Sequence, residues 1–284
     1  MVSAIFDEVH KTASHLGSCD PKWLKDGTPP KFITHELTES PAGVVREDLL
    51  LLHGLFGAMS NWDSIFPCFA KFSNPIALSF PIISGHRSEV KVKALTVFTE
   101  FFIRQRKVQP VTLCGNSLGG HVALRLTLAR PDLVDCLVLS GASGLYEHSV
   151  DALPVRPDHT FVREHMARVF YNSRFITDQA VNEISEIIAD RANILNLIHC
   201  ARSAKKDNLA KVLGQIKVPT LLLWGEDDQV TTMAVAETFH KLIPHSELVS
   251  IKNCGHAPMI EYPEWFAGEV ERFLAKNSRF HKKG

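Results

Sequence analysis

Six short runs of almost entirely apolar residues constrain the fold of this chain more than any other feature of its sequence. Each run ends at a Gly, Pro or Asn, or within a few residues of one. Because the runs are continuously apolar rather than alternating, they predict strands that are buried on both faces, as in a parallel sheet. The runs are Leu49–His53, Ile76–Phe80, Val111–Cys114, Cys136–Ser140, Thr220–Trp224 and Glu247–Ile251.

Segments with the length and apolar spacing of helices lie between these runs. Since strand and helix alternate, we predict an α/β fold in which helices flank a mostly parallel central sheet. The predicted helices are Lys91–Arg106, Gly119–Arg130, Met233–Leu242 and Pro263–Lys276.

One region interrupts this alternation. Residues 146–214 contain no convincing strand but several amphipathic helical stretches. We predict a helical cap over 146–214, inserted into a core formed by 46–145 and 215–284. Such a cap would cover the carboxyl ends of the strands, where open α/β sheets bind their ligands. Residues 1–45 are predicted to form an N-terminal extension with the first strand or strands.

Composition limits the partners and the compartment. The chain has 31 Lys and Arg and 31 Asp and Glu residues, and this balance gives no sign of a nucleic-acid or acidic membrane partner. The six cysteines lack a CxxC pair, which favours a reducing compartment over a disulfide framework or a zinc site. No apolar run approaches the ~20 residues that span a bilayer, and Asp7 and Glu8 argue against a secretory signal. We expect a cytoplasmic protein with no nucleic-acid partner and no membrane span.

The segment Gly115–Gly119 (GNSLG) fits the pattern G-x-S-x-G between an apolar run and a predicted helix. A tight turn there would impose an unfavourable backbone on Ser117, while the glycines let the chains pass closely. The turn would also present the hydroxyl at a helix N-terminus, where developing negative charge is favoured. We therefore interpret Ser117 as a nucleophile rather than as part of a structural turn.

A serine nucleophile needs a base and an acid that orients the base. His256 lies in the loop after the last apolar run and is the candidate base. Glu226, Asp227 and Asp228 follow the run that ends at Trp224 and supply the candidate acids. We favour Asp228, with Asp227 as the alternative. The remaining carboxylates are expected to be solvated or to cap the next helix.

Two backbone amides are the candidates for an oxyanion hole, which needs two donors. Leu118 follows Ser117 at the start of the predicted helix, and Leu55 lies in a glycine-containing loop after the first apolar run. His53 of that loop is interpreted as a structural brace rather than as a catalytic group.

Together these residues resemble the α/β-hydrolase superfamily over about 48–274. The resemblance rests on an HG loop, the GxSxG turn, a GxxD sequence at a strand end and a late GH, and on the order Ser117, Asp228, His256. It implies an α/β-hydrolase fold with a helical cap, and hydrolysis without a metal or an organic cofactor. A serine at the turn distinguishes the chain from haloalkane dehalogenases and epoxide hydrolases, which place aspartate there.

Within the superfamily, GNSLGG, ARPDLVDCLVLSGASGL and VFYNSRFITDQAVNEI are similar to the meta-cleavage-product (carbon–carbon bond) hydrolases and related carboxylesterases. Several positions depart from that branch. The loop HGLFGAMSNW lacks the HGGGPG form, Ser79 replaces an aspartate, Ala257 replaces a tryptophan, and Ile184 lies near where the branch has an arginine for the acidic group of its substrate. These departures favour an ester over a dienoate substrate.

The predicted activity is hydrolysis of a small carboxylic ester or related carbonyl compound by a monomer or homodimer. A carbon–carbon bond hydrolase, a ligand receptor with slow hydrolysis and a perhydrolase remain alternatives. The candidate substrate-binding residues are Phe56, Asn116, Phe170 and Phe175, and apolar Met166, Val169 and Ile176 of the predicted cap either line the pocket or pack the cap helices together.

Overall fold

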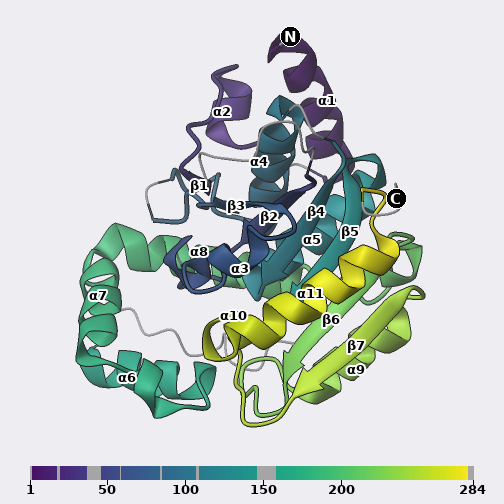
Figure 1. The fold of residues 1–284 in the computed structure, drawn as a ribbon. Coiled ribbons are helices and arrows are strands. Elements are labelled where there is room, and N and C mark those ends of the chain that lie inside the picture. The colour runs from purple at the N-terminus through teal and green to yellow at the C-terminus, as the bar shows by residue number, and fades with distance from the viewer. Residues whose placement is uncertain are drawn as a thin grey trace.

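The computed structural model describes residues 2–17, 20–36, 46–57, 59–83, 85–106, 109–145 and 158–280. Their centre is a seven-stranded sheet with the order β1-β3-β2-β4-β5-β6-β7 (Figure 1). All neighbouring strands pair in parallel except β1 and β3, which are antiparallel. The strands are β1 (Thr34–Glu36), β2 (Asp48–Leu52), β3 (Asn74–Leu78), β4 (Val111–Asn116), β5 (Val134–Ser140), β6 (Thr220–Gly225) and β7 (Ser246–Ile251).

The six apolar runs all form strands of this sheet, so the mostly parallel α/β fold predicted from the sequence is confirmed. β2, β4, β5 and β6 are buried along their whole length, which explains why their runs do not alternate. The run Glu247–Ile251 was also expected to be buried on both faces, but it forms the edge strand β7 and is only half-buried. In β2, Leu50 and Leu52 pack into one apolar cluster, whereas Leu49 and Leu51 pack into a second cluster on the other face. Successive side chains of a strand point to opposite faces, so a strand covered on both sides must be apolar throughout.

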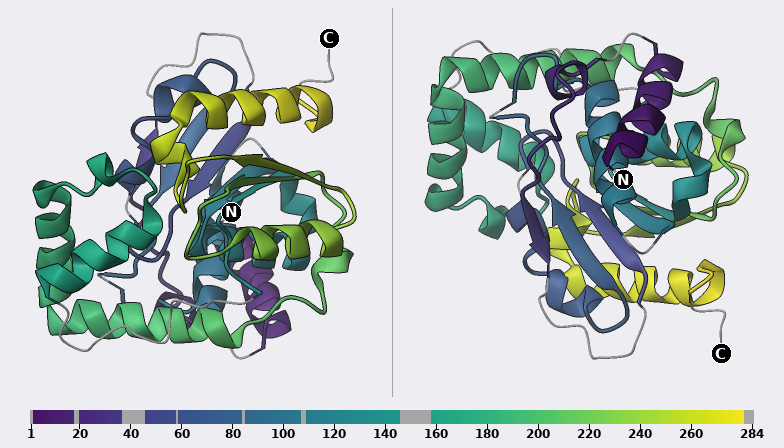
Figure 2. Two further views of the ribbon diagram at one scale, coloured as in Figure 1. Left: turned by 90° about the horizontal axis from the view of Figure 1, so that it is seen from below. Right: turned by 90° about the horizontal axis from the view of Figure 1, so that it is seen from above.

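Helices cover the two faces of the sheet. On one face lie α1 (Val2–His15), α4 (Val92–Gln105), α5 (Leu118–Ala129) and α9 (Met233–Leu242), and on the other lie α3 (Phe66–Phe69), α10 (Pro258–Glu261) and α11 (Pro263–Asn277). Figure 2 shows α9 and α11 on opposite sides of the sheet. The remaining short helices are α2 (Lys22–Lys25), η1 (Met59–Trp62), η2 (Pro131–Leu133), η4 (Ser173–Phe175) and η5 (Leu213–Gln215).

The N-terminal extension packs against the core. Val9 and Ala13 of α1 are fully buried. Phe6 of the same helix meets the ring of Phe101 of α4 at 5.1 Å, and Trp23 meets that ring at 5.4 Å. These contacts place α1 and α2 as an ordered layer on α4.

In the described residues 158–219, between β5 and β6, lie three α-helices: α6 (His159–Val169), α7 (Asp178–Ala189) and α8 (Arg191–Lys206). Side chains cap the start of each one. Asp158 accepts a hydrogen bond from the Phe161 amide, Thr177 from Ala180, and Asp190 from Ala192 and Asn193.

These inserted helices extend to one side of the sheet in Figure 1, and no strand occurs in 158–214. The first part of the predicted cap, 146–157, lies outside the described residues, and the domain boundaries stay a prediction. Along the described ranges, no helix is both long and apolar enough to cross a membrane.

The backbone at the start of α5 packs closely against the end of β2. A Cβ atom added to Gly119 would lie 2.0 Å from the carbonyl oxygen of Leu52. Real side chains do not approach backbone atoms so closely, so this contact requires glycine. Gly268 of α11 is the opposite case, because a Cβ atom there would have no neighbour within 4 Å.

We expect Gly119→Ala to lower the free energy of unfolding by at least about 2 kcal/mol, since the new methyl group displaces α5 from β2. The matched change Gly268→Ala should raise it by about 0.5–1 kcal/mol, because alanine loses less conformational freedom in a helix. Urea unfolding of both variants and the wild type measures these values. Equal stabilities of the two variants would contradict this account of the α5–β2 contact.

Candidate active site

Ser117 lies on the turn between β4 and α5 with a left-handed backbone, at φ 54° and ψ −117°. This region is unfavourable for a residue with a side chain, so the surroundings must hold it there. The Ser117 amide donates to the carbonyl of Ser140, at 3.0 Å. The Ser117 carbonyl accepts from the amides of His121, at 3.2 Å, and Ser143, at 3.1 Å. The end of β5 and the first turn of α5 thus fix the strained turn that the sequence predicted.

The structure brings His256 and Asp228 together. The imidazole Nδ1 lies 2.8 Å from the Asp228 Oδ2, and both residues are buried. The Asp228 carboxylate also accepts from the amides of Val230 (2.7 Å) and Thr231 (2.9 Å) and from the Thr231 hydroxyl (3.0 Å). These donors fix the orientation of the carboxylate. With a carboxylate as its partner, Nδ1 carries the proton and leaves Nε2 free as a base.

The neighbouring carboxylates lie elsewhere. Asp227 is exposed, and its Oδ2 accepts from the Asn253 amide at 3.0 Å. Glu226 is exposed and accepts from the Ser250 hydroxyl at 3.0 Å. Of the three consecutive acids, Asp228 is the one that the turn after β6 directs to His256.

Contacts from several elements hold the His256 loop in place. The His256 amide donates to the carbonyl of Val169 at 2.7 Å, and the His256 carbonyl accepts from the side-chain amide of Asn116 at 3.0 Å. Gly141 packs on the ring: with φ at +52°, a Cβ atom there would lie 2.6 Å from Nδ1 of His256. The position of the imidazole therefore depends on β4, on the end of β5 and on the end of α6.

The predicted oxyanion loop lies beside Ser117. A Cβ atom at Gly54 would be 3.2 Å from the Ser117 Cβ and 3.7 Å from its Oγ, so the loop backbone passes next to the hydroxyl. Leu55 follows in this loop. Leu118 is the first residue of α5, where backbone amides have no acceptor within the helix. The contribution of these two amides to an oxyanion hole stays a proposal.

His53 braces this loop, as the sequence suggested. Its Nδ1 lies 2.8 Å from the carbonyl oxygen of Gly54, and its Nε2 accepts from the Phe80 amide at 2.9 Å. Since Nε2 is the acceptor, the proton lies on Nδ1 and the ring is neutral. Burial lowers the pKa of His53 to about 4, which agrees with this neutral form.

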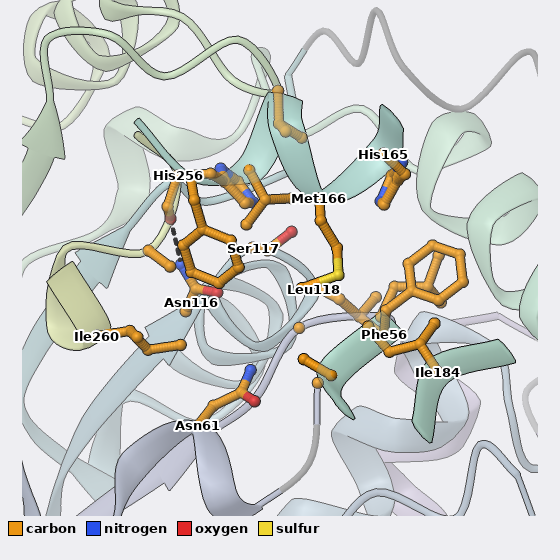
Figure 3. A pocket seen from close by; sticks show the side chains of 18 of the residues that line it. Phe56, Asn61, Asn116, Ser117, Leu118, His165, Met166, Ile184, His256 and Ile260 are labelled. Carbon is orange, nitrogen blue, oxygen red and sulfur yellow. Dashed lines mark hydrogen bonds between the residues drawn. The ribbon is translucent and has the colours of Figure 1, made fainter. Parts of the chain in front are cut away.

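A cavity of about 390 Å³ opens over Ser117, between the sheet and the inserted helices. We call it the Ser117 cavity; Figure 3 shows the side chains that line it. Asp228 lies outside this lining, behind His256. Every other predicted site residue lines it: Ser117, His256, Leu55, Leu118, Phe56, Asn116, Phe170 and Phe175.

The candidate pocket residues of the inserted region divide into two groups. Met166, Val169, Phe170 and Phe175 line the cavity, and the rings of Phe170 and Phe175 lie 5.5 Å apart. Ile176 is absent from the lining and packs on the apolar core instead. For Ile176 the structure therefore supports the packing alternative.

Within the part of the chain that the structure describes, no hydrogen bond joins the Ser117 hydroxyl to the His256 ring. Catalytic hydrogen bonds are often long without substrate and shorten when it binds. No cluster of three or more His, Cys, Asp or Glu residues suited to a metal ion occurs among the described residues.

Residues 49–269 match the model of a family described as the alpha/beta hydrolase family. The chain belongs to this family. A solved relative, MGS-MChE2, is an alpha/beta hydrolase enzyme from the metagenome of sediments from the lagoon of Mar Chica, Morocco. It is 30% identical, with a TM-score of 0.70 over 87% of this chain and 96% of its own.

Two curated relatives of this hydrolase have different named activities. The 2-hydroxy-6-oxo-6-(2'-aminophenyl)hexa-2,4-dienoic acid hydrolase of Metapseudomonas resinovorans is 28% identical over 251 residues, covering 82% of this chain and 85% of that protein. The pimeloyl-[acyl-carrier protein] methyl ester esterase of Nitrosomonas europaea is 27% identical over 241 residues, covering 77% and 92%. The suspected likeness to carbon–carbon bond hydrolases and esterases is thus confirmed.

The sequence analysis missed three residues of the hydrolase site. Buried Glu261 accepts from the Gly255 amide (2.7 Å) and from the Asn172 amide (2.9 Å), and so ties the His256 loop to the segment after α6. Thr231 supports Asp228, and His165 of α6 lines the cavity. The sequence offered one signal, and it concerned Glu261. This acid lies five residues after His256, among apolar residues where a solvated carboxylate is not expected. The sequence around Thr231 and His165 contains no motif that would have identified them as site residues.

The low pKa of His53 predicts a pH dependence of stability. In the unfolded chain His53 binds a proton below pH about 6.5, whereas in the folded hydrolase it stays neutral down to about pH 4. The unfolded state therefore binds more protons between these values, and the free energy of unfolding falls as the pH falls through them. We expect His53 to contribute roughly 2 kcal/mol of this loss between pH 7.5 and 5.

Urea unfolding of wild type and His53→Gln at both pH values measures this contribution, since the other titrating groups are common to the two proteins. Glutamine keeps an acceptor for the Phe80 amide but does not titrate. A loss of stability that is equal in both proteins would show that the buried imidazole is not its cause.

Proposed function

We propose that this hydrolase cleaves a carboxylic ester through an acyl-enzyme, with Ser117 as nucleophile, His256 as base and Asp228 as the acid that orients His256. One observation carries the proposal: a buried Asp228–His256 pair at 2.8 Å and a serine with a strained left-handed backbone meet at one cavity. A structural turn would not need that strain, and strained backbone is concentrated at functional sites.

In the proposed reaction, Nε2 of His256 takes the proton of the Ser117 hydroxyl while the serine oxygen attacks the ester carbonyl. The amides of Leu55 and Leu118 hold the carbonyl oxygen as it becomes negative. His256 then gives its proton to the departing alcohol, which leaves Ser117 acylated. A water molecule, deprotonated by His256, attacks the acyl group and releases the carboxylic acid. Asp228 stabilises the imidazolium that forms in each half-reaction.

The charges around the cavity favour a neutral ester. No lysine or arginine occurs among the described residues that line it. Among these lining residues, Glu183 is the one with a carboxylate, since Asp228 lies behind His256 outside the lining. Ile184 lies in the lining, at the position where the carbon–carbon bond hydrolases were expected to have an arginine. An acidic dienoate would enter this cavity without a cationic partner, which costs free energy.

Carbon–carbon bond cleavage remains a second candidate because relatives are named for it. Besides the Metapseudomonas resinovorans protein, a 2-hydroxy-6-oxononadienedioate/2-hydroxy-6-oxononatrienedioate hydrolase of Paraburkholderia xenovorans is 27% identical over 276 residues. Steady-state rates with short p-nitrophenyl esters and with a 2-hydroxy-6-oxo-dienoate separate the two. A larger kcat/KM for the dienoate would replace the ester proposal by the second candidate.

Replacing the nucleophile should abolish turnover. We expect Ser117→Ala to lose at least ~10³-fold in kcat for p-nitrophenyl esters, as catalytic serines do elsewhere, and to lose labelling by a fluorophosphonate. Ser143→Ala removes another hydroxyl from the same cavity and should still be labelled and hydrolyse esters. Retained ester hydrolysis in Ser117→Ala would exclude the proposed mechanism.

The two neighbouring aspartates offer a matched test of the acid. Asp228→Asn should lower kcat about 10³-fold or more, because the amide no longer stabilises the imidazolium or selects the tautomer with a free Nε2. Asp227→Asn removes the same charge at the neighbouring position. Because the Asp227 carboxylate accepts a hydrogen bond from the Asn253 amide and lies away from His256, kcat of this variant should stay close to that of the wild type. If Asp227→Asn were the more damaging change, the assignment of the acid would be wrong.

A further inference from the structure

A histidine of α6 lines the Ser117 cavity and has no part in the proposed acyl transfer. In Figure 3, His165 lies on the other side of Ser117 from Ile260. The ring of Phe56 meets the His165 ring edge-on at 4.9 Å, and the ring of Phe161 stacks on it at 6.1 Å. Two aromatic rings thus restrict the plane of the imidazole.

Two other polar side chains of the cavity are already engaged by the protein. The Asn116 amide donates to the carbonyls of Ser140 and His256, and the Thr231 hydroxyl donates to Asp228. His165 differs from these two: like Asn61 of the same lining, its side chain forms no hydrogen bond with a residue in the described ranges. A neutral imidazole has one donor and one acceptor nitrogen. Because the residue lines the cavity, a molecule bound there contacts the His165 side chain.

The His165 ring is uncharged under ordinary conditions. Burial lowers its pKa to about 4, with a smaller contribution from the nearby positive charges of His256 and Arg168. A neutral ring supplies no opposite charge to offset the desolvation of a carboxylate, whereas a hydroxyl or a carbonyl group loses less hydration when it pairs with the ring. The apolar surroundings strengthen this preference, since Met166 and Ile184 line the same wall.

Building on the proposed ester hydrolysis, we propose that His165 determines specificity by hydrogen-bonding a neutral oxygen of the substrate that is remote from the scissile ester. The preferred substrates are then esters with a hydroxyl or carbonyl group in the acyl or alcohol part, not plain alkyl esters. A site built to hydrogen-bond such a group rejects the analogue that lacks it, because the polar group of the site is left unpaired.

Two substrate series test this proposal. One pairs p-nitrophenyl esters of hydroxylated acyl chains with alkyl chains of equal length, and the other pairs acetates of diols with acetates of matching alkanols. At the length that reaches His165, the wild type should prefer the oxygenated ester by about tenfold or more in kcat/KM. His165→Phe keeps an aromatic ring between Phe56 and Phe161 and should lose this preference. His165→Gln, with a donor and an acceptor, should restore part of it.

His159→Phe is the matched control, because His159 is an exposed histidine at the start of the same helix and does not line the cavity. It should keep both the rate and the preference. Equal kcat/KM ratios in wild type and His165→Phe across both series would overturn the proposal about His165, while ester turnover lost in Ser117→Ala would leave the proposed function standing.

If the wild type turned over no ester, the proposed function would fail and a binding measurement would decide the role of His165. Calorimetry with Ser117→Ala would compare methyl ketones that carry a remote hydroxyl with their alkyl counterparts. Tighter binding of the hydroxylated ketone that disappears in Ser117→Ala/His165→Phe supports the proposal. Equal affinities for the two ketones contradict it.

Discussion

The left-handed backbone of Ser117 is the constraint on which the rest of the site depends. Such a conformation costs of order 1–3 kcal/mol. The protein offsets this cost with a hydrogen bond from the Ser117 amide to Ser140 and with bonds from the His121 and Ser143 amides to the Ser117 carbonyl. The bonds with Ser140 and Ser143 depend on the parallel pairing of β5 with β4, which brings the end of β5 beside the turn. The contact between Gly119 and Leu52 then fixes the direction of α5. The position of the Ser117 hydroxyl therefore depends on several strands of the sheet and not on the turn alone.

Parallel pairing also explains why distant segments meet at this point. The loop of Gly54 follows β2, Ser117 follows β4, Asp228 follows β6 and His256 follows β7, so all four lie at the carboxyl edge of one sheet. The inserted helices are tied to the same edge. The His256 amide bonds the end of α6 through the Val169 carbonyl, and Glu261 bonds the segment that follows. The position of α6, and with it of the cavity wall, is thus coupled to the position of the imidazole.

Features that depend on local sequence patterns could be predicted from the sequence, whereas features that depend on contacts between distant segments could not. The strands were predictable because burial on both faces leaves a continuous apolar run, and Ser117 was predictable because its strain requires small neighbours at fixed spacing. The choice between Asp227 and Asp228 was not fully predictable, since it depends on how the turn after β6 presents each carboxylate. Glu261 was missed because two of its amide partners lie about 90 residues away in the sequence. His165 was missed because its contact with Phe56 and its place in the cavity arise only in the folded chain. No spacing rule reports such a contact.

In the proposed site, the buried Asp228–His256 pair adjoins a cavity lined by no lysine or arginine among the described residues, and this combination bears on selectivity. The charge of Asp228 is enclosed behind His256 and held by four donors, so it acts on the imidazole and hardly on the cavity. Burial keeps His165 neutral in the opposite part of the lining. A substrate therefore meets hydrogen-bonding capacity without a fixed opposite charge. Anionic groups would lose hydration there without compensation, whereas neutral oxygens exchange water for a donor or acceptor at little cost. For the proposed hydrolysis, we therefore expect the burial of these charges to favour neutral over acidic substrates.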